Sequence, residues 1–261
     1  MKNIATLREQ ADELERLLRS KTFPISVKLL EKEADIPANA IRPKRDLGRQ
    51  IFLCQAFAMA RREGKMVAML TEDMYCFEPV LGYGLAEAPD YFLEGNNRYP
   101  QDVETLEAGS NWAREFPRLA RGKYVGVLST SLLTTDFAPD AVVIYCNPAQ
   151  LRLLLGGIAY KDGYDIISTL SSHAACVYAV VPLMHTGKCQ VTIPCRGDQR
   201  AAAAQDDELI FTIPIGKLVE LLYGMKQVGE TGYKMPNVYM MGEQHKLPDS
   251  YERLAKMLGM R

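Results

Sequence analysis

Four cysteines have the residue type and the spacing to support metal chemistry. One segment begins at Cys54 and ends at Cys76. A second segment of similar layout begins at Cys176 and ends at Cys195. Each segment begins with a cysteine in an apolar, helix-like stretch, reaches a Gly-Lys pair, passes through a short β-like run and ends on its second cysteine. Thiolates are soft ligands, and four of them suit a tetrahedral zinc ion or the irons of an iron–sulfur cluster. The repeated pattern therefore predicts a metal centre to which each segment contributes two thiols.

The spacing of these cysteines favours a cluster over zinc. Zinc sites usually take cysteines in close pairs such as C-x-x-C, and the sequence contains no such pair. Twenty-one residues separate Cys54 from Cys76, and eighteen separate Cys176 from Cys195. The ligands can therefore meet only through tertiary structure, which a cubane cluster tolerates. We predict a 4Fe–4S cluster held by all four thiols, with zinc as the alternative.

A packing role is the competing interpretation. Free cysteine is among the most often buried residue types and behaves as a small hydrophobe. Cys54 and Cys176 lie in apolar stretches where that role is natural, and composition alone favours it. The repetition of cysteine at both ends of two similar units shifts those four towards ligation. Cys146 and Cys189 lie outside this pattern and are predicted to pack.

Composition excludes several classes of protein. The 261 residues are 48% hydrophobic and 24% charged, with a formal net charge of −1 and a sequence pI near 6.3. That balance gives no electrostatic footprint for nucleic acid or for an anionic membrane. The N-terminal stretch lacks the apolar core of a signal peptide, and no stretch is long and apolar enough to span a bilayer. We therefore expect a cytoplasmic protein with reduced thiols, and its composition is compatible with a homodimer.

Helices and strands are expected to alternate throughout the chain. Periodicity predicts helices over residues 3–20, 46–63, 103–116 (interrupted at Gly109), 147–163 and 215–228, one around Cys176 and one over 250–260, with strands over 23–30, 65–70, 124–129, 141–146, 164–170, 191–195 and 208–214. Asn147-Pro148 is a helix start signal. The predicted class is α/β, or α+β, around a mixed sheet, with a possible internal duplication. No linker divides residues 1–261, so we expect a single domain.

Several segments resemble the uncharacterised archaeal and bacterial family DUF169. They are PISVKLL (24–30), Cys54-Gln-Ala with its helix and Gly64, Cys76 with Leu81-Gly82, YCNPAQLRLLLGG (145–157), Ser172 to Cys176, and IPCRGDQRAAAAQDDELIFTIP (193–214). The resemblance covers roughly residues 20–230 and leaves the first helix and an extension over 231–261 outside. It implies no assigned activity, but it makes a cysteine-ligated iron–sulfur centre plausible, because Cys54, Cys76, Cys176 and Cys195 match the family's cysteine positions.

Four further residues are candidates for binding a substrate. Arg196 and Arg200 follow Cys195 closely and could hold a carboxylate or phosphate, or simply be solvated. Lys28 lies in an apolar strand and would suit anion binding, although a lysine in such a pattern more often faces water. His173 precedes Cys176 by three residues and could be a ligand, a proton donor or an ordinary turn residue.

These residues support three functional hypotheses. The first is an iron–sulfur protein, possibly a redox or Lewis-acid enzyme acting on a small anionic molecule. The second is a non-catalytic module that binds a small molecule or structural zinc. The third is an enzyme with Cys195 as nucleophile, activated by Arg196. Phosphate-binding loops, dinucleotide fingerprints and serine-hydrolase elbows do not occur in the sequence.

Overall fold

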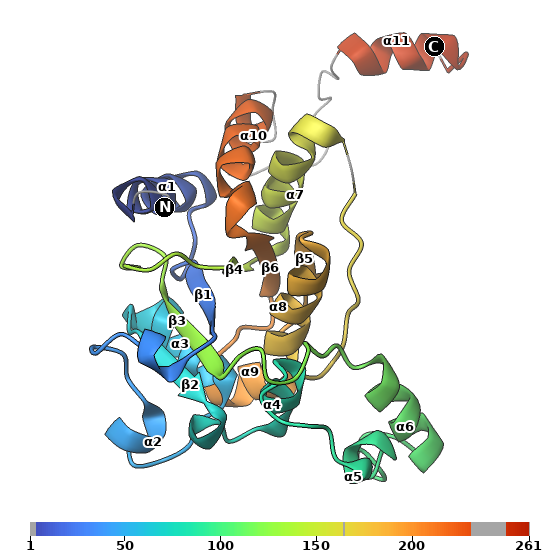
Figure 1. The fold of residues 1–261 in the computed structure, drawn as a ribbon. Helices are drawn as coiled ribbons and strands as arrows, with labels where there is room; N and C mark the ends of the chain where they lie inside the picture. The colour runs from blue at the N-terminus through green and yellow to red at the C-terminus, as the bar shows by residue number, and fades with distance from the viewer. Residues whose placement is uncertain (1–3, 164, 231–248, 261) are drawn as a thin grey trace.

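A six-stranded antiparallel sheet forms the centre of the computed structural model, which describes residues 4–163, 165–230 and 249–260 (Figure 1). The strand order is β2-β3-β1-β4-β6-β5. The strands are β1 (Ile25–Leu30), β2 (Val67–Leu70), β3 (Gly126–Ser131), β4 (Ala141–Cys146), β5 (Gln190–Thr192) and β6 (Leu209–Pro214). The prediction of interleaved helices and strands is confirmed. The sheet is not mixed, contrary to the prediction, because every ladder between its neighbouring strands is antiparallel.

Helices connect these strands and cover both faces of the sheet. They are α1 (Ile4–Leu18), α2 (Pro43–Asp46), α3 (Leu53–Glu63), α4 (Phe77–Gly82), α5 (Asp90–Leu93), α6 (Leu106–Glu115), α7 (Pro148–Asp162), α8 (Ala175–Thr186), α9 (Arg196–Ala202), α10 (Leu218–Glu230) and α11 (Asp249–Met257). Three short 3-10 turns, η1 (Glu33–Asp35), η2 (Thr71–Asp73) and η3 (Ile215–Lys217), complete the described elements.

The chain between β1 and β6 consists of two repeats with one topology. The first repeat, residues 25–131, shares the order β1, α3, β2, α4 and β3 with the second, residues 141–214, which runs β4, α8, β5, α9 and β6. The first also contains α2, α5 and α6, and the second also contains α7. Counted inward from the outer edge of the sheet, the strands of the first repeat lie in the order β2, β3, β1. Those of the second repeat lie in the equivalent order β5, β6, β4. The two first strands, β1 and β4, pair with each other at the centre. The duplication suggested by the cysteine spacing therefore extends to the whole sheet.

The strand registers of the two repeats also correspond. Ile25 faces Ser131 at the start of β1, and Ala141 faces Pro214 at the start of β4. At the outer edges, Val67 of β2 faces Ser129, and Gln190 of β5 faces Thr212. Both long helices end on a left-handed glycine, Gly64 at φ 66° and Gly187 at φ 64°. Glycine suits that position because it has no Cβ to clash with the backbone.

Alternate residues of the central strand β4 face two separate cores. Val143 and Tyr145 of β4 face the core covered by α3, α4, α6 and α8, and Val142, Ile144 and Cys146 face the core covered by α1, α7 and α10. This alternation follows from the two-residue period of a strand. Figure 1 shows α1, α7 and α10 grouped together on one side of the sheet. The other side carries the helices that begin at the predicted cysteine ligands.

The structure corrects three of the expected elements. Residues 47–52 are not helical, because α2 ends at Asp46 and α3 begins only at Leu53. Described residues 165–170 form no strand: Ile167 is 91% exposed, so its apolar pattern faces solvent. Helix α6 is continuous through Gly109. The backbone of Gly95 packs against this residue, and a Cβ on Gly109 would lie only 2.6 Å from the Gly95 carbonyl oxygen. That glycine marks a close contact rather than a helix break.

Candidate metal centre

All four cysteines of the repeated pattern line one pocket. Its volume is about 290 Å³. The lining residues are Phe52, Cys54, Cys76, Glu78, Pro79, His173, Ala174, Cys176, Cys195, Arg196, Gly197, Arg200 and Ala201. Residues separated by more than a hundred positions therefore meet at one place. Cys146 and Cys189 are buried in the opposite core, where they pack among aliphatic side chains.

Each repeat supplies its two thiols from equivalent positions. Cys54 and Cys176 are the second residues of α3 and α8, and both are 5% exposed. Cys76 and Cys195 are the N-caps of α4 and α9, and both are half-buried. The thiols thus lie at helix N-termini, where free backbone N–H groups favour negative charge.

Burial raises the pKa of all four thiols. The pKa of Cys76 rises to about 12 and that of Cys195 to about 11, and those of Cys54 and Cys176 also lie well above the ordinary thiol range. Repulsion between the four sulfurs adds to this effect. The backbone N–H of Leu53 opposes the shift at Cys76, and that of Ala175 opposes it at Cys195. Thiols in this setting become thiolates when cations lie beside them.

Gly197 opens space between two of the sulfurs. A Cβ on this residue would lie 3.5 Å from Cys195 Sγ and 3.8 Å from Cys54 Sγ. Glycine therefore leaves room in front of both sulfurs that any other residue would fill. The described residues contain no group of three or more His, Cys, Asp or Glu side chains arranged to hold a single metal ion. The four thiols surround a pocket and do not converge on one point.

A buried polar network contacts the sulfur of Cys195. Cys195 Sγ donates to Asp198 Oδ2 at 3.0 Å, and the Tyr145 hydroxyl donates to Asp198 Oδ1 at 2.7 Å. The Arg61 guanidinium lies 3.9 Å from the centre of the Tyr145 ring and pairs with Glu208 at 2.8 Å. Asp198 and Arg61 are at most 1% exposed. Sequence reasoning missed this network, although an acidic residue three positions after an N-cap is a capping-box signal.

The predicted substrate-binding residues divide into two groups. Three of them line the pocket: His173, Arg196 and Arg200. Lys28, on β1, does not, and its ammonium donates to the Ala138 carbonyl at 3.3 Å. The side chains of Arg196 and Arg200 make no hydrogen bond or ion pair within the described part of the chain. Burial, followed by the charges of Arg98 and Arg196, lowers the pKa of His173.

Glu78 brings a carboxyl group to the same pocket. It lines the cavity from α4, two residues after Cys76. Burial raises the pKa of this carboxyl above its ordinary value, and the nearby Arg98 partly opposes the rise. The pocket therefore combines two arginines with one acidic group.

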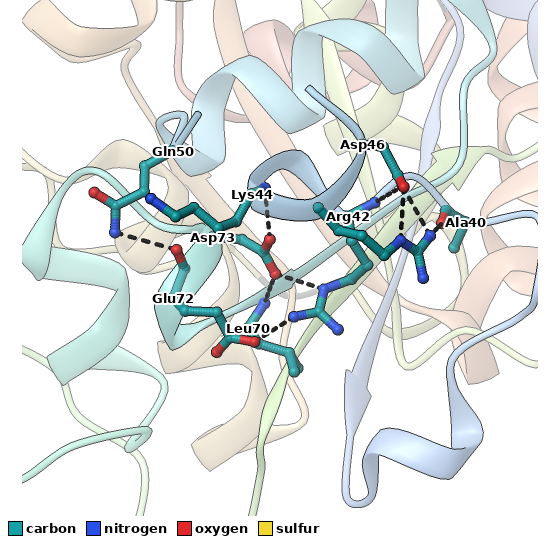
Figure 2. A network of polar contacts seen from close by, with 9 residues as sticks. Ala40, Arg42, Lys44, Asp46, Gln50, Leu70, Glu72 and Asp73 are labelled. Carbon is teal, nitrogen blue, oxygen red and sulfur yellow. Dashed lines mark hydrogen bonds and ion pairs between the residues drawn. The ribbon is translucent and has the colours of Figure 1, made fainter. Parts of the chain in front are cut away.

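A second polar network positions Cys76 (Figure 2). Asp73 has no exposed side-chain surface and accepts from Arg42 Nε at 2.6 Å, Lys44 N at 2.9 Å and Leu70 N at 3.0 Å. The turn that contains Asp73 also pairs with the segment entering α3, because Ile51 N donates to Asp73 O at 3.0 Å. Figure 2 shows Asp73 at the centre of these contacts. The network ties the approach to Cys76 to the approach to Cys54.

Comparison with known proteins assigns the chain to a family. The model of DUF169, described as uncharacterised ArCR proteins, matches residues 13–224. The chain belongs to the DUF169 family. An uncharacterized protein of Methanocaldococcus jannaschii is similar to it, with 24% identity over 238 residues that cover 88% of this chain and all of the relative. No solved structure matches the chain. The match to DUF169 includes all four pocket cysteines, and no helix among the described residues could cross a membrane.

Proposed function

We propose that this DUF169 protein binds a 4Fe–4S cluster through Cys54, Cys76, Cys176 and Cys195. The observation that carries the proposal is the meeting of four thiols, two from each repeat, around one pocket. The remaining two cysteines lie in the core on the opposite side of the sheet. Packing alone gives no reason for the four to share a cavity.

The shape of the pocket supports a cluster more than a zinc ion. A zinc site places four sulfurs about 2.3 Å from one point. A cluster carries its irons at separate corners, so its thiolates approach from around a volume. The pocket of about 290 Å³ and the space beside Gly197 fit the second arrangement. Zinc binding remains the second candidate, because thiolates suit both.

The thiol-enzyme hypothesis has weaker support. A nucleophilic cysteine requires a lowered pKa so that thiolate forms at neutral pH. Burial instead raises the pKa of Cys195 to about 11, and Asp198 adds to the rise. Arg196 is not among the groups that lower the pKa of this thiol.

The residues around the cysteines suit a cluster that acts on a small anion. When bound, the cluster would supply electron transfer or Lewis-acid chemistry. The guanidinium groups of Arg196 and Arg200 would hold a carboxylate or phosphate beside it, since arginine forms paired hydrogen bonds with both. The backbone N–H groups of Leu53 and Ala175 would face the sulfurs of the two N-cap cysteines.

Anaerobic purification followed by elemental analysis tests the proposal. We expect about four irons and about four acid-labile sulfides per chain, with visible absorption that fades on exposure to air. The Cys54→Ala variant should lose most of the iron. Cys146→Ala is the matched control, because Cys146 is equally buried but lies in the other core, and it should keep the iron.

Two results would contradict the proposal. One is a folded wild-type protein without iron or sulfide after anaerobic reconstitution. The other is zinc without sulfide, which would support a structural zinc site instead. Circular dichroism of both variants separates loss of metal from loss of fold.

A further inference from the structure

The surroundings of the two N-cap cysteines differ sharply. Phe77, Pro79 and Leu81 are the first, third and fifth residues of α4 after Cys76. The corresponding residues of α9 after Cys195 are charged: Arg196, Asp198 and Arg200. The backbone positions are equivalent, so the difference lies in the side chains. At these three positions the second repeat carries charged side chains and the first carries apolar ones, although Glu78, the second residue of α4, also lines the pocket.

Asp198 acts directly on the sulfur of Cys195. Its Oδ2 lies 3.0 Å from Cys195 Sγ and also accepts from the Cys195 backbone N–H at 3.3 Å. A buried carboxylate at this distance competes with a metal for the sulfur, because it accepts the hydrogen of the thiol and repels a thiolate. Cys76 makes no hydrogen bond to a carboxylate among the described residues, and Glu78 acts on its thiol only through charge. Its sulfur faces the backbone N–H of Leu53, as that of Cys195 faces the N–H of Ala175.

We propose that Cys195 is the replaceable ligand of the cluster, and that a small molecule bearing a carboxylate takes its place. This inference rests on the proposed function. The ligand's carboxylate is held by Arg196 and Arg200, which line the pocket and have no other partner in the described part of the chain. His173 lies across the same pocket as a further polar contact.

The exchange is balanced without an oxidant or reductant. With a cluster bound, Cys54, Cys76 and Cys176 would hold three irons, and the fourth would exchange the Cys195 thiolate for a carboxylate oxygen without a change of oxidation state. The released thiolate would take a proton from solvent. The resulting thiol would donate a hydrogen bond to Asp198 Oδ2, which is the contact that the structure shows.

Matched alanine variants of the two N-cap cysteines test the inference. After anaerobic reconstitution, Cys195→Ala should keep iron and sulfide within about twofold of the wild type, whereas Cys76→Ala should lose at least about tenfold. Urea unfolding controls for the fold of each variant, and Cys76→Ser replaces Cys76→Ala if the latter does not fold. Equal loss of iron in both variants would overturn the inference and leave the proposed function intact. A wild-type chain without a cluster would overturn both.

Labelled ligands identify the chemistry at the open iron. Malonate enriched in oxygen-17 should broaden the electron paramagnetic resonance signal of the reduced wild-type cluster. The Arg196→Gln/Arg200→Gln double variant should lose that broadening but keep its iron. Oxygen-17 phosphate is the second arm, and broadening by phosphate alone would overturn the assignment to a carboxylate. An absence of broadening with either anion would overturn ligand exchange at this iron.

Discussion

The two repeats share a backbone but differ in what surrounds their thiols. In both, one cysteine is the second residue of a long helix and the other is the N-cap of a short one. In the first repeat the N-cap cysteine is held by a loop anchored at Asp73, away from its sulfur. In the second, a buried carboxylate touches the sulfur itself. Equivalent ligands therefore lie in different electrostatic settings.

The difference extends into the sheet beneath the pocket. The hydroxyl of Tyr145, the fifth residue of β4, donates a hydrogen bond to Asp198. The fifth residue of β1, which occupies the equivalent position in the first repeat, is Leu29. Glu208 immediately precedes β6, and Val125 immediately precedes β3. A repeated fold can keep its topology while the residue types at individual buried positions change. Such a position requires only an apolar side chain or a polar one whose hydrogen bonds are made. At these two positions the second repeat carries a polar residue and the first an apolar one.

Removing the charge of Glu208 should have the largest effect on stability. Glu208 and Arg61 form a buried pair whose side chains are 4% and 1% exposed. Glu208→Gln leaves the Arg61 charge buried without a counter-charge, so we expect a loss of about 3–5 kcal/mol in the free energy of unfolding. Urea denaturation measures it. Glu63→Gln, at the exposed pair with Lys65, is the control and should cost less than about 1 kcal/mol. Equal costs would show that the buried pair contributes no more to stability than an exposed one.

Asp73→Asn tests how the first repeat positions its N-cap cysteine. Asp73 accepts three hydrogen bonds with no exposed side-chain surface, so an amide turned towards those donors leaves at least one buried group unpaired. We expect a loss of about 2–3 kcal/mol, measured by urea denaturation, with slower metal loading. Asp46→Asn changes a carboxylate on the exposed side of the same network and should cost less. A larger loss at Asp46 would contradict the role given to Asp73.

Gly197→Ala should separate metal binding from folding. The new methyl group would make ordinary contacts at 3.5 Å and 3.8 Å with two sulfurs, so the fold should accept it. Replacing glycine in a helix by alanine stabilises by up to about 1 kcal/mol. The same methyl group occupies the cluster's space, and iron content should fall several-fold. Gly216→Ala, where nothing lies within 4 Å, is the control. Unchanged iron in Gly197→Ala would place the metal elsewhere in the pocket.

Lys28→Ala should have the smallest effect. The Lys28 ammonium contacts Ala138 O at 3.3 Å and does not line the pocket. We expect malonate affinity to stay within about twofold of the wild type, because a half-buried lysine outside the site acts only through screened, long-range charge. Isothermal titration of the reconstituted protein measures it. A tenfold loss of malonate affinity would show that Lys28 contributes to the binding site. The first repeat would then also supply a charged group, which would weaken the contrast between the repeats.

Local patterns in the sequence allowed much of the fold to be predicted. The strand over 141–146 and the helix start at Asn147-Pro148 agree with the structure, because alternation and capping are properties of neighbouring residues. The predicted strand over 164–170 was wrong, because an apolar run shows β propensity without showing whether a sheet edge is available to pair with it.

The sequence by itself determined that four cysteines terminate two similar units and that Arg196 and Arg200 follow one of them. Only the tertiary structure decided that all four thiols share a pocket, that Lys28 lies outside it and that Asp198 contacts Cys195. The reason is physical. Spacing along the chain fixes positions within a helix or a turn, whereas the meeting of two repeats depends on the pairing of β1 with β4 and on the packing of α3 and α8 against the sheet.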